Sequence, residues 1–282
     1  MPANIQSQPT PCQVFYELNC FFKPIVENAF WIAIFTQNFA MPKNVIPYKN
    51  SELGKKEQVT EMFDKVSSNY DFLNRLLTFG IDISWRKNVV QLVMDNKAKK
   101  VLDIATGTGD LAIMMAKEGI DEVTGLDISI GMLDIGKKKV IDQGLESKVD
   151  MIIGDSEKLP FKDETFDAIT VAFGVRNFEN LELGLNEIYR VLKKTGVFVV
   201  LETSQPASFP VKQGFQFYSK YIIPNVGKLF SKDKKAYDYL PESAAAFPYG
   251  DEFNNILLKT GFNTSKVYPQ TFGVATIYHA IK

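Results

Sequence analysis

Two acids and two glycines, each near the end of an apolar segment, form the clearest candidate binding site in this chain. Asp103 lies at the end of the first segment and is followed by Gly107 and Gly109, and Asp127 ends the second segment. Glycine has no side chain and adopts backbone conformations that other residues avoid, so a ligand can lie against the main chain there. An acid about 20 residues after such a loop can accept hydrogen bonds from ribose hydroxyls. The spacing therefore predicts the adenosine-binding half of a doubly wound α/β domain.

Two classes of adenosine cofactor are compatible with this loop. Residues 107–112 (GTGDLA), with Thr108 between the glycines, match the dinucleotide pattern G-x-G-x-x-G/A. Residues 103–109 also match D-x-A-x-G-x-G, a form typical of S-adenosylmethionine sites. S-adenosylmethionine carries a cationic amino group and a sulfonium, which suit the carboxylate of Asp103, whereas a diphosphate would be repelled by it. Asp103 therefore favours the sulfonium cofactor, and a carboxylate that only orders the turn is the alternative.

Two further strand ends add polar residues to the same region. Asp155 and Ser156 follow a third apolar segment, and Arg176 and Asn177 follow a fourth. Ligands in open α/β sheets bind beyond the carboxyl ends of the strands, so we expect these side chains to meet in one crevice. In an S-adenosylmethionine site, the loop with Asp155 and Ser156 would cover the adenine. An arginine beside an asparagine at such a strand end favours a functional role over a structural ion pair.

The elements that must position these residues alternate along the chain. Five apolar segments are predicted strands, and they lie near 100–105, 122–127, 149–154, 166–173 and 196–203. Helical segments separate them, which favours a mainly parallel sheet. Two more strands, around 263–269 and 272–281, would complete a seven-stranded sheet whose last strand is antiparallel. The expected fold class is therefore a Rossmann-like α/β domain.

Residues 57–95, ahead of the first strand, predict two helices that would form a lid over the crevice. Apolar residues recur there at three- and four-residue spacing, which is typical of an amphipathic helix, and Gly80 breaks the pattern. Tyr70, Asp71 and Asn74 are polar residues on one turn of the first helix. Their clustering makes them candidates for the functional site.

Between residues 205 and 248 the alternation of strands and helices breaks. This stretch is aromatic, basic in patches and interrupted by Pro224 and Gly227. It predicts a helical cap inserted into a constant scaffold, a common place for substrate specificity. With the lid and the cap, residues 41–282 are expected to form a single domain.

Longer segments are more specific than the glycine loop. Residues 70–87 (YDFLNRLLTFGIDISWRK) and 190–204 (RVLKKTGVFVVLETS) match motifs of one family, as do the FGVRN run and residues 236–248. On these motifs, the chain from about Asn50 to the C-terminus resembles the ubiquinone/menaquinone biosynthesis C-methyltransferases (the UbiE/MenG family). The resemblance implies a class I S-adenosylmethionine-dependent methyltransferase that converts demethylmenaquinol to menaquinol. A ubiquinone precursor or another small lipid-like molecule is the alternative substrate.

The resemblance also implies roles for the candidate residues. The cofactor would be held by Asp103, Gly107, Thr108, Gly109, Asp127, Asp155 and Ser156. Arg176 keeps its proton at physiological pH, so it would stabilise a phenolate and act through a water or a neighbouring carboxylate. Asp71 is the leading candidate for that carboxylate, and Tyr70 and Asn177 would orient the hydroxyl or the water. No metal ion is expected, because a sulfonium already activates its methyl group.

Two departures from the family pattern limit what can be carried over. Asp82 stands where the family usually has histidine, which argues against a histidine-based proton role. Ala172 stands where a serine often contacts the cofactor, so one expected contact is missing.

Composition limits the classes of partner. The chain has 282 residues with 33 acidic and 32 basic side chains, so it shows no electrostatic footprint for nucleic acid. No apolar run approaches the ~18 residues that a membrane span needs. Cys12 and Cys20 form no metal-ligand or disulfide pattern, and His279 is the only histidine. We expect a cytoplasmic enzyme that transiently contacts the inner membrane face to reach a prenylated quinol, and a homodimer is a further expectation.

Residues 1–40 differ in composition from the rest of the chain. They are rich in aromatic residues, nearly free of charge and followed directly by Met41. We favour translation from Met41, with an idle leader and an interfacial membrane anchor as alternatives.

Overall fold

The structure is a computed structural model that describes residues 45–230 and 233–282. These residues belong to one compact unit, Pro42–Lys282. The predicted leader, 1–40, lies outside the described residues.

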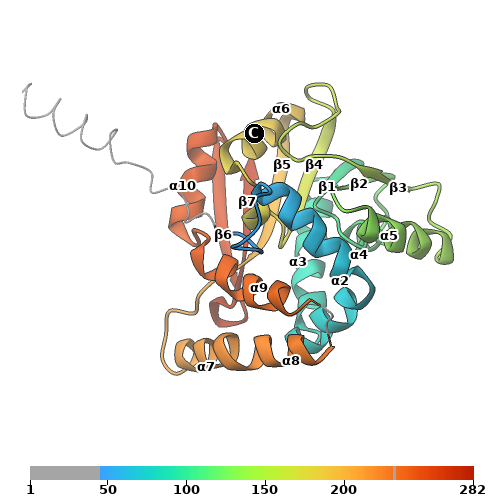
Figure 1. The fold of residues 1–282 in the computed structure, drawn as a ribbon. Coiled ribbons are helices and arrows are strands. Elements are labelled where there is room, and N and C mark those ends of the chain that lie inside the picture. The colour runs from blue at the N-terminus through green and yellow to red at the C-terminus, as the bar shows by residue number, and fades with distance from the viewer. Residues whose placement is uncertain (1–44, 231–232) are drawn as a thin grey trace, which may run out of the picture. The chain divides into compact units, whose positions relative to one another are not determined.

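A seven-stranded sheet forms the centre of this unit (Figure 1). Its strands are β1 (Lys100–Ile104), β2 (Glu122–Asp127), β3 (Val149–Ile153), β4 (Phe166–Ala172), β5 (Leu192–Thr203), β6 (Thr264–Gln270) and β7 (Ala275–Ile281). The strand order is β3-β2-β1-β4-β5-β7-β6. Strands β1 to β5 pair in parallel, whereas β7 pairs antiparallel with both β5 and β6. The predicted seven-stranded, mainly parallel sheet with an antiparallel last strand is confirmed.

Side chains alternate between the two faces of each strand, and this alternation builds a core on each side of the sheet. Val101 packs into one core and Leu102, the next residue, into the other. The first core is covered by α3 (Ile81–Asp95), α4 (Asp110–Lys117) and α5 (Ile130–Asp142). The second is covered by α6 (Leu181–Val191) and α10 (Asp251–Thr260). Helices on both faces explain why the strands read as continuous apolar runs.

The loop between β1 and α4 requires its glycines. Gly107 has a φ of 58° and Gly109 has a φ of 78°, both in the left-handed region. A Cβ atom on Gly109 would also lie 3.1 Å from the Met151 methyl group. The chain can therefore turn directly from β1 into α4 only with residues that tolerate this backbone.

The segment ahead of the first strand forms α2 (Lys55–Thr78) and α3, which meet at Phe79 and Gly80. Gly80 has a φ of 75°, which lets the chain turn sharply between the helices. The apolar stripe of α2 packs against α5 and the cap through Val59, Met62, Val66, Leu73, Met132, Tyr237 and Tyr239. Most apolar residues of α2 are therefore core residues.

The cap consists of four helical segments: α7 (Val211–Phe217), η2 (Tyr218–Ile222), α8 (Ile223–Phe230) and α9 (Lys234–Ala246). Short helical turns also occur at η1 (Val175–Asn177) and η3 (Thr271–Gly273). The helix continues through Pro224 and Gly227, which lie within α8, and the π-helical segment η2 directly precedes α8.

Candidate functional site

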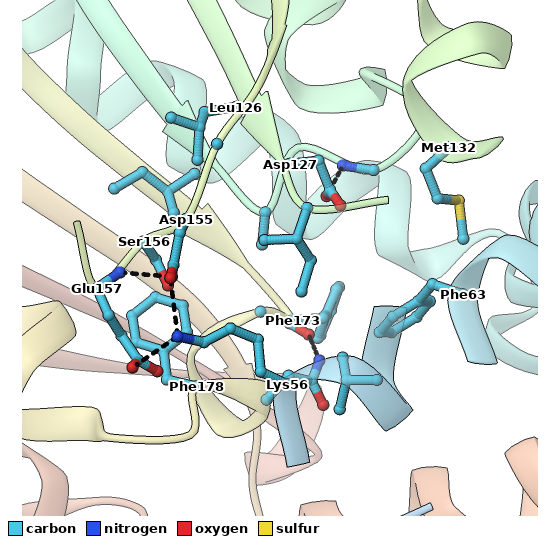
Figure 2. A pocket seen from close by; sticks show the side chains of 18 of the residues that line it. Lys56, Phe63, Leu126, Asp127, Met132, Asp155, Ser156, Glu157, Phe173 and Phe178 are labelled. Atoms are coloured by element: carbon cyan, nitrogen blue, oxygen red, sulfur yellow. Dashed lines mark hydrogen bonds and ion pairs between the residues drawn. The ribbon is translucent and has the colours of Figure 1, made fainter. Parts of the chain in front are cut away.

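A cavity lies beyond the carboxyl ends of β1 to β4, and we call it the strand-end cavity (Figure 2). Its empty space is about 670 Å³. Its walls come from the loops that follow these strands, from α5 and from one side of α2. The predicted site residues in its lining are Tyr70, Gly107, Asp127, Asp155, Ser156 and Asn177.

A second cavity, the cap cavity, lies between the α2–α3 junction and the cap helices and is open to solvent; its empty space, with the solvent at its mouth, is about 3490 Å³. Arg176 and Asn74 lie in its wall, among many apolar side chains of the cap. Tyr70 and Phe173 line both cavities. The two spaces therefore meet at these two side chains.

Asp127 ends β2 at the floor of the strand-end cavity. Its Oδ2 accepts the Gly107 N–H at 2.8 Å and its Oδ1 accepts the Ser129 N–H at 2.9 Å. Burial raises the pKa of the Asp127 carboxyl, and these backbone donors oppose that rise. A carboxylate has about four lone-pair sites, so it can still accept two ribose hydroxyls as predicted.

Asp155 and Ser156 lie on the opposite side of this cavity, in the loop after β3 (Figure 2). Lys56 of α2 donates to Asp155 Oδ2 at 2.8 Å and to Glu157 Oε2 at 3.1 Å. Asp155 Oδ1 also accepts the Glu157 N–H at 2.9 Å. The N-terminal end of α2 is therefore tied by charge to the loop that would cover adenine.

Apolar side chains complete the walls of the strand-end cavity. Leu126, Met132, Phe63 and Phe178 project around the space between Asp127 and Asp155 (Figure 2). Apolar walls with acceptors at both ends suit an adenosine, whose ring is flat and whose ribose and exocyclic amine are donors. The residues present therefore fit the predicted cofactor, and Ala172 adds to this wall without a hydroxyl.

Asp103 is not among the described residues that line either cavity. Its side chain is buried, and its two oxygens accept the hydroxyls of Thr106 and Thr170 at 2.6 Å each. Burial raises the pKa of Asp103 to about 6, although both hydroxyls lower it. Asp103 lies opposite Thr170 in the register of β1 and β4, so the two side chains lie next to each other on one face of the sheet. These contacts are those of a residue that orders the turn, and a contact of Asp103 with the cofactor stays a prediction.

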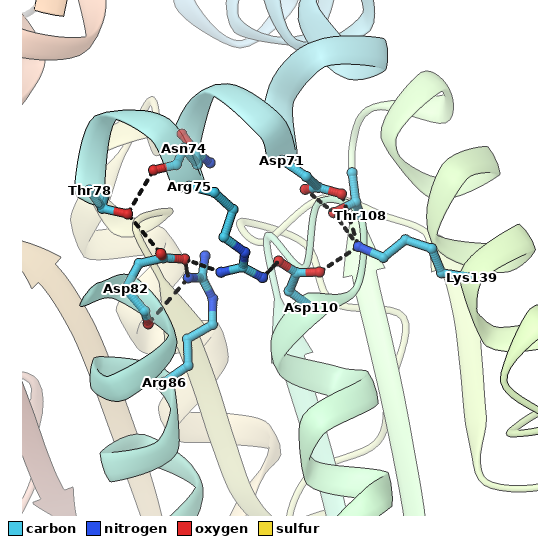
Figure 3. A network of polar contacts seen from close by, with 9 residues as sticks. All are labelled: Asp71, Asn74, Arg75, Thr78, Asp82, Arg86, Thr108, Asp110 and Lys139. Atoms are coloured by element: carbon cyan, nitrogen blue, oxygen red, sulfur yellow. Dashed lines mark hydrogen bonds and ion pairs between the residues drawn. The ribbon is translucent and has the colours of Figure 1, made fainter. Parts of the chain in front are cut away.

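Thr108 and Gly109 also lie outside the described lining of both cavities. Thr108 donates its hydroxyl to Asp71 Oδ1 at 2.6 Å, and Lys139 donates to Asp71 Oδ2 at 3.0 Å (Figure 3). Asp110, in the first turn of α4, pairs with Lys139 as well. Two carboxylates therefore lie at the helix N-terminus that would have to hold a dinucleotide's diphosphate.

The same network continues to the α2–α3 junction (Figure 3). Arg75 donates to Asp110 Oδ2 at 2.8 Å and also pairs with Asp82. Arg86 pairs with Asp82 too, and Thr78 donates its hydroxyl to Asp82 Oδ1 at 2.7 Å. Asp82, which replaces the family's usual histidine, is buried between two arginines and joins α2 to α3 through these ion pairs.

Arg176 follows β4, in the short helical turn η1, and its side chain is buried. Its guanidinium pairs with Glu202, which lies near the end of β5. Its backbone carbonyl accepts the Lys55 side chain at 3.0 Å. Burial lowers the pKa of Lys55 to about 8, while acidic neighbours oppose this.

Tyr70 lies at the junction of the cavities, and Asn177 lies in the wall of the strand-end cavity. Asn177 Oδ1 accepts the Tyr239 hydroxyl from α9 at 3.0 Å, so the cap is joined to the loop after β4. Burial raises the pKa of Tyr239 to about 12 and also raises the pKa of Tyr70. Both tyrosines are therefore neutral hydrogen-bonding groups at neutral pH.

Asp71 lies elsewhere, and its predicted role beside Arg176 is corrected. It is not among the described residues that line either cavity, and it binds Thr108 and Lys139 instead. Successive residues of a helix point about 100° apart, so Asp71 faces α4 and α5 when Tyr70 faces the cavities. The carboxylate beside Arg176 is Glu202.

Sequence reasoning missed three residues of this region: Glu202, Tyr239 and Lys56. Glu202 and Tyr239 both lie within segments that carry the family resemblance, 190–204 and 236–248. Glu202 directly follows the apolar run 197–201 near the end of β5, and that position was the available signal. Nothing in the local sequence distinguishes Lys56 from the neighbouring Lys55.

Proteins with similar sequences carry the names of methyltransferases of quinone biosynthesis. Demethylmenaquinone methyltransferase from Bacteroides fragilis is 46% identical over 242 residues, covering 85% of this chain and 98% of the relative. The enzyme of that name from Porphyromonas gingivalis is 43% identical, covering 86% and 99%. The ubiquinone/menaquinone biosynthesis C-methyltransferase UbiE from Geobacter sulfurreducens is 41% identical, covering 84% and 92%.

Solved structures share the fold. An S-adenosylmethionine-dependent methyltransferase from Thermotoga maritima has a TM-score of 0.55 at 21% identity, covering 79% of this chain and 99% of that one. One from Methanococcus maripaludis has a TM-score of 0.56 at 21% identity, covering 82% and 96%.

The model of the family described as ubiE/COQ5 methyltransferase matches residues 51–282. Of the two cofactor classes, the methyl donor S-adenosylmethionine is therefore the one that applies. The resemblance seen in the sequence motifs is confirmed, and the chain belongs to the ubiE/COQ5 methyltransferase family.

Proposed function

We propose that this enzyme transfers a methyl group from S-adenosylmethionine to a ring carbon of demethylmenaquinol. The observation that carries the proposal is the meeting of two unlike cavities at Tyr70 and Phe173. The strand-end cavity has acidic ends and suits adenosine, whereas the cap cavity is far larger and mostly apolar and suits a prenylated ring. The names of the Bacteroides and Porphyromonas relatives support the choice of acceptor.

Bound S-adenosylmethionine supplies an already activated methyl group, so the protein has to align and ionise the acceptor. Tyr70 and Phe173, at the junction, would hold the ring against the methyl group, and such alignment contributes up to about 7–11 kcal/mol. Arg176 lies in the wall of the cap cavity, where its permanent charge would stabilise the quinol oxyanion. The lid and cap would keep water from this junction.

Methyl transfer from labelled S-adenosylmethionine to a short-chain demethylmenaquinol tests the proposal. We expect turnover with this naphthoquinol, and an Arg176→Ala variant with at least ~100-fold lower kcat, because one preorganised donor to a developing oxyanion contributes about that much. Calorimetry should show unchanged binding of S-adenosylhomocysteine, since Arg176 lies outside the described lining of the strand-end cavity. Turnover of a ubiquinone-type benzoquinol alone would reassign the substrate, and full activity of the variant would remove the role of Arg176.

We further propose that the cap cavity takes its substrate from a membrane surface, at the inner face of the membrane. Helices α7 to α8 (residues 211–230) carry three lysines and no acid. Phe217 and Tyr221 are 60% and 48% exposed, and Phe79, in the wall of the cap cavity, is 78% exposed. Phe217 and Tyr221 lie one turn apart and outside the described cavity lining, so they form an outer apolar face of the cap.

A cationic helix that is apolar on its outer face matches the interfacial region of an anionic bilayer. Within residues 45–230 and 233–282, no helix has the length and apolar character to cross a membrane. The proposed contact is therefore peripheral for this part of the chain.

A further inference from the structure

The two carboxylate oxygens of the buried Glu202 side chain differ in their hydrogen-bond partners. Its side chain is 1% exposed. Oε1 pairs with the Arg176 guanidinium and also accepts the Thr203 N–H at 2.8 Å and the Thr203 hydroxyl at 3.2 Å. Oε2 is buried with no hydrogen-bond partner among the described residues, and so is Arg176 Nε. A buried polar atom without a partner is costly, so two of them in one ion pair require an explanation.

The pair lies behind the wall of the cap cavity. Arg176 and Thr203, which both hold Oε1, are lining residues of that cavity, whereas Glu202 itself is not among the described lining residues of either cavity, so a substrate hydroxyl would have to reach Oε2 between these two side chains. The unpartnered atoms are one acceptor and one donor. A hydroxyl group donates one hydrogen bond and accepts others, so a single hydroxyl could satisfy both Oε2 and Nε.

Several other groups near the cap cavity are less suited to accept a proton. Two carboxylates of α9, Asp238 and Glu242, also line the cavity, and Glu242 is half exposed and pairs with Lys49 at 3.5 Å. Arg176 is permanently protonated. Asp82, which also lines the cavity, is held by two arginines. Tyr239 from α9 and Tyr278 from β7 face Glu202, and burial raises the pKa of each to about 12, so both stay neutral up to high pH.

We propose that Glu202 is the proton acceptor for the quinol hydroxyl, through Oε2, while Arg176 binds the oxyanion that results. This inference rests on the proposed function. The quinol O–H bond breaks, its proton moves to Oε2, and the electron pair enters the ring. After the ring carbon has gained its methyl group, it loses its hydrogen to water as a proton, and Glu202 returns its own proton to the ring oxygen. One proton is released per turnover, and Glu202 ends as a carboxylate.

Glu202→Gln tests this role, because glutamine keeps the shape and an acceptor for Arg176 but cannot take the proton. We expect kcat to fall by about 10²–10⁴, the usual contribution of a general base, with KM for the quinol within ~3-fold. The loss should shrink as the pH rises, because the quinol then ionises in solution. Formate should restore part of the activity of Glu202→Ala. Calorimetric binding of S-adenosylhomocysteine should stay at the wild-type value.

Glu187→Gln is the matched control, because Glu187 also pairs with an arginine, Arg190, but lies on α6 outside both described linings. It should leave kcat within ~3-fold. If the fall in kcat of Glu202→Gln is independent of pH and formate does not rescue Glu202→Ala, Glu202 only holds Arg176 in place. If Glu202→Gln keeps the wild-type kcat, Glu202 has no role in the reaction. The glutamine variant could fail to bind S-adenosylhomocysteine. In that case a pH-dependent loss of kcat in Glu202→Asp and formate rescue of Glu202→Ala support the proton-accepting role, and the absence of both contradicts it. Failure of the proposed substrate would appear in the wild-type enzyme, whereas failure of this inference appears only in the variants.

Discussion

Asp103 shows how one residue couples the cofactor loop to folding. Its carboxylate is held between Thr106, in the glycine loop, and Thr170, on the neighbouring strand. Burial raises the pKa of Asp103 to about 6, against an ordinary value of 3.8. Between these two pH values the folded protein retains a proton that the unfolded chain has lost.

The consequence is a pH-dependent stability. Protonated Asp103 makes its full contribution to the free energy of unfolding below about pH 4. This contribution, about 3 kcal/mol, is lost as the pH rises through about 6. Asp103→Asn should therefore flatten the fall in the free energy of unfolding between pH 4 and 6. Urea unfolding at several pH values measures this. Asp134→Asn, at an exposed position of α5, should leave the slope unchanged, and an unchanged slope in Asp103→Asn would show that Asp103 ionises normally.

Helix α2 is the element that links the two cavities to the rest of the fold. Its first turn is held by Lys55, on the Arg176 and Phe178 carbonyls, and by Lys56, on Asp155. Its C-terminal half is held by Asp71 and Arg75, which bind residues of α4 and α5 (Figure 3). Both ends of α2 are therefore held in place, and Tyr70 projects from this helix into both cavities.

Asp71→Asn separates a bracing role from a chemical one. The substitution weakens the ion pair with Lys139 and should lower the free energy of unfolding by about 1 kcal/mol, since a partly exposed charged hydrogen bond contributes about that much. We expect kcat to stay within ~3-fold, measured beside thermal unfolding. A kcat loss of ~100-fold at unchanged stability would instead return Asp71 to the proton-transfer step.

The molecule as a whole places a large apolar cavity beneath a cationic cap. The cap helices line the cap cavity with one face, and Phe217 and Tyr221 are exposed on the other. A helix that is apolar on two faces lacks a burial partner for one of them. An anionic bilayer surface would cover that face and bring a prenylated substrate to the cavity.

A vesicle sedimentation experiment tests this contact. Wild type should sediment with phosphatidylglycerol-rich vesicles and be released by salt, because the lysines of residues 211–230 are screened. A Phe217→Ser, Tyr221→Ser double variant should bind at least ~10-fold more weakly. The matched control is Ile141→Ser, at a residue of α5 that is 60% exposed. Equal binding of both variants would remove the proposed surface, and a concentration-dependent dimer lost only in the double variant would assign this face to the expected homodimer.

Local patterns predicted much of the fold and part of the site. The β-strands and the glycine loop depend on neighbouring residues: Gly107 and Gly109 adopt the positive φ that the loop needs, and Asp127 ends β2 as predicted. Family motifs added Tyr70, Arg176 and Asn177, which all line one of the cavities. Membership of the methyltransferase family was likewise contained in the sequence, because the motifs span most of the chain.

The tertiary structure decided which charges meet. Asp103 binds Thr170 because the strand register places the two residues side by side, and Asp71 binds Lys139 of α5 because of the rotation of α2. Glu202 became the partner of Arg176 because β4 and β5 are parallel neighbours, so their carboxyl ends lie side by side. Spacing along the chain predicts which residues share a turn or a strand. The direction of a side chain across two packed elements depends on register and helix rotation, which only the folded protein defines.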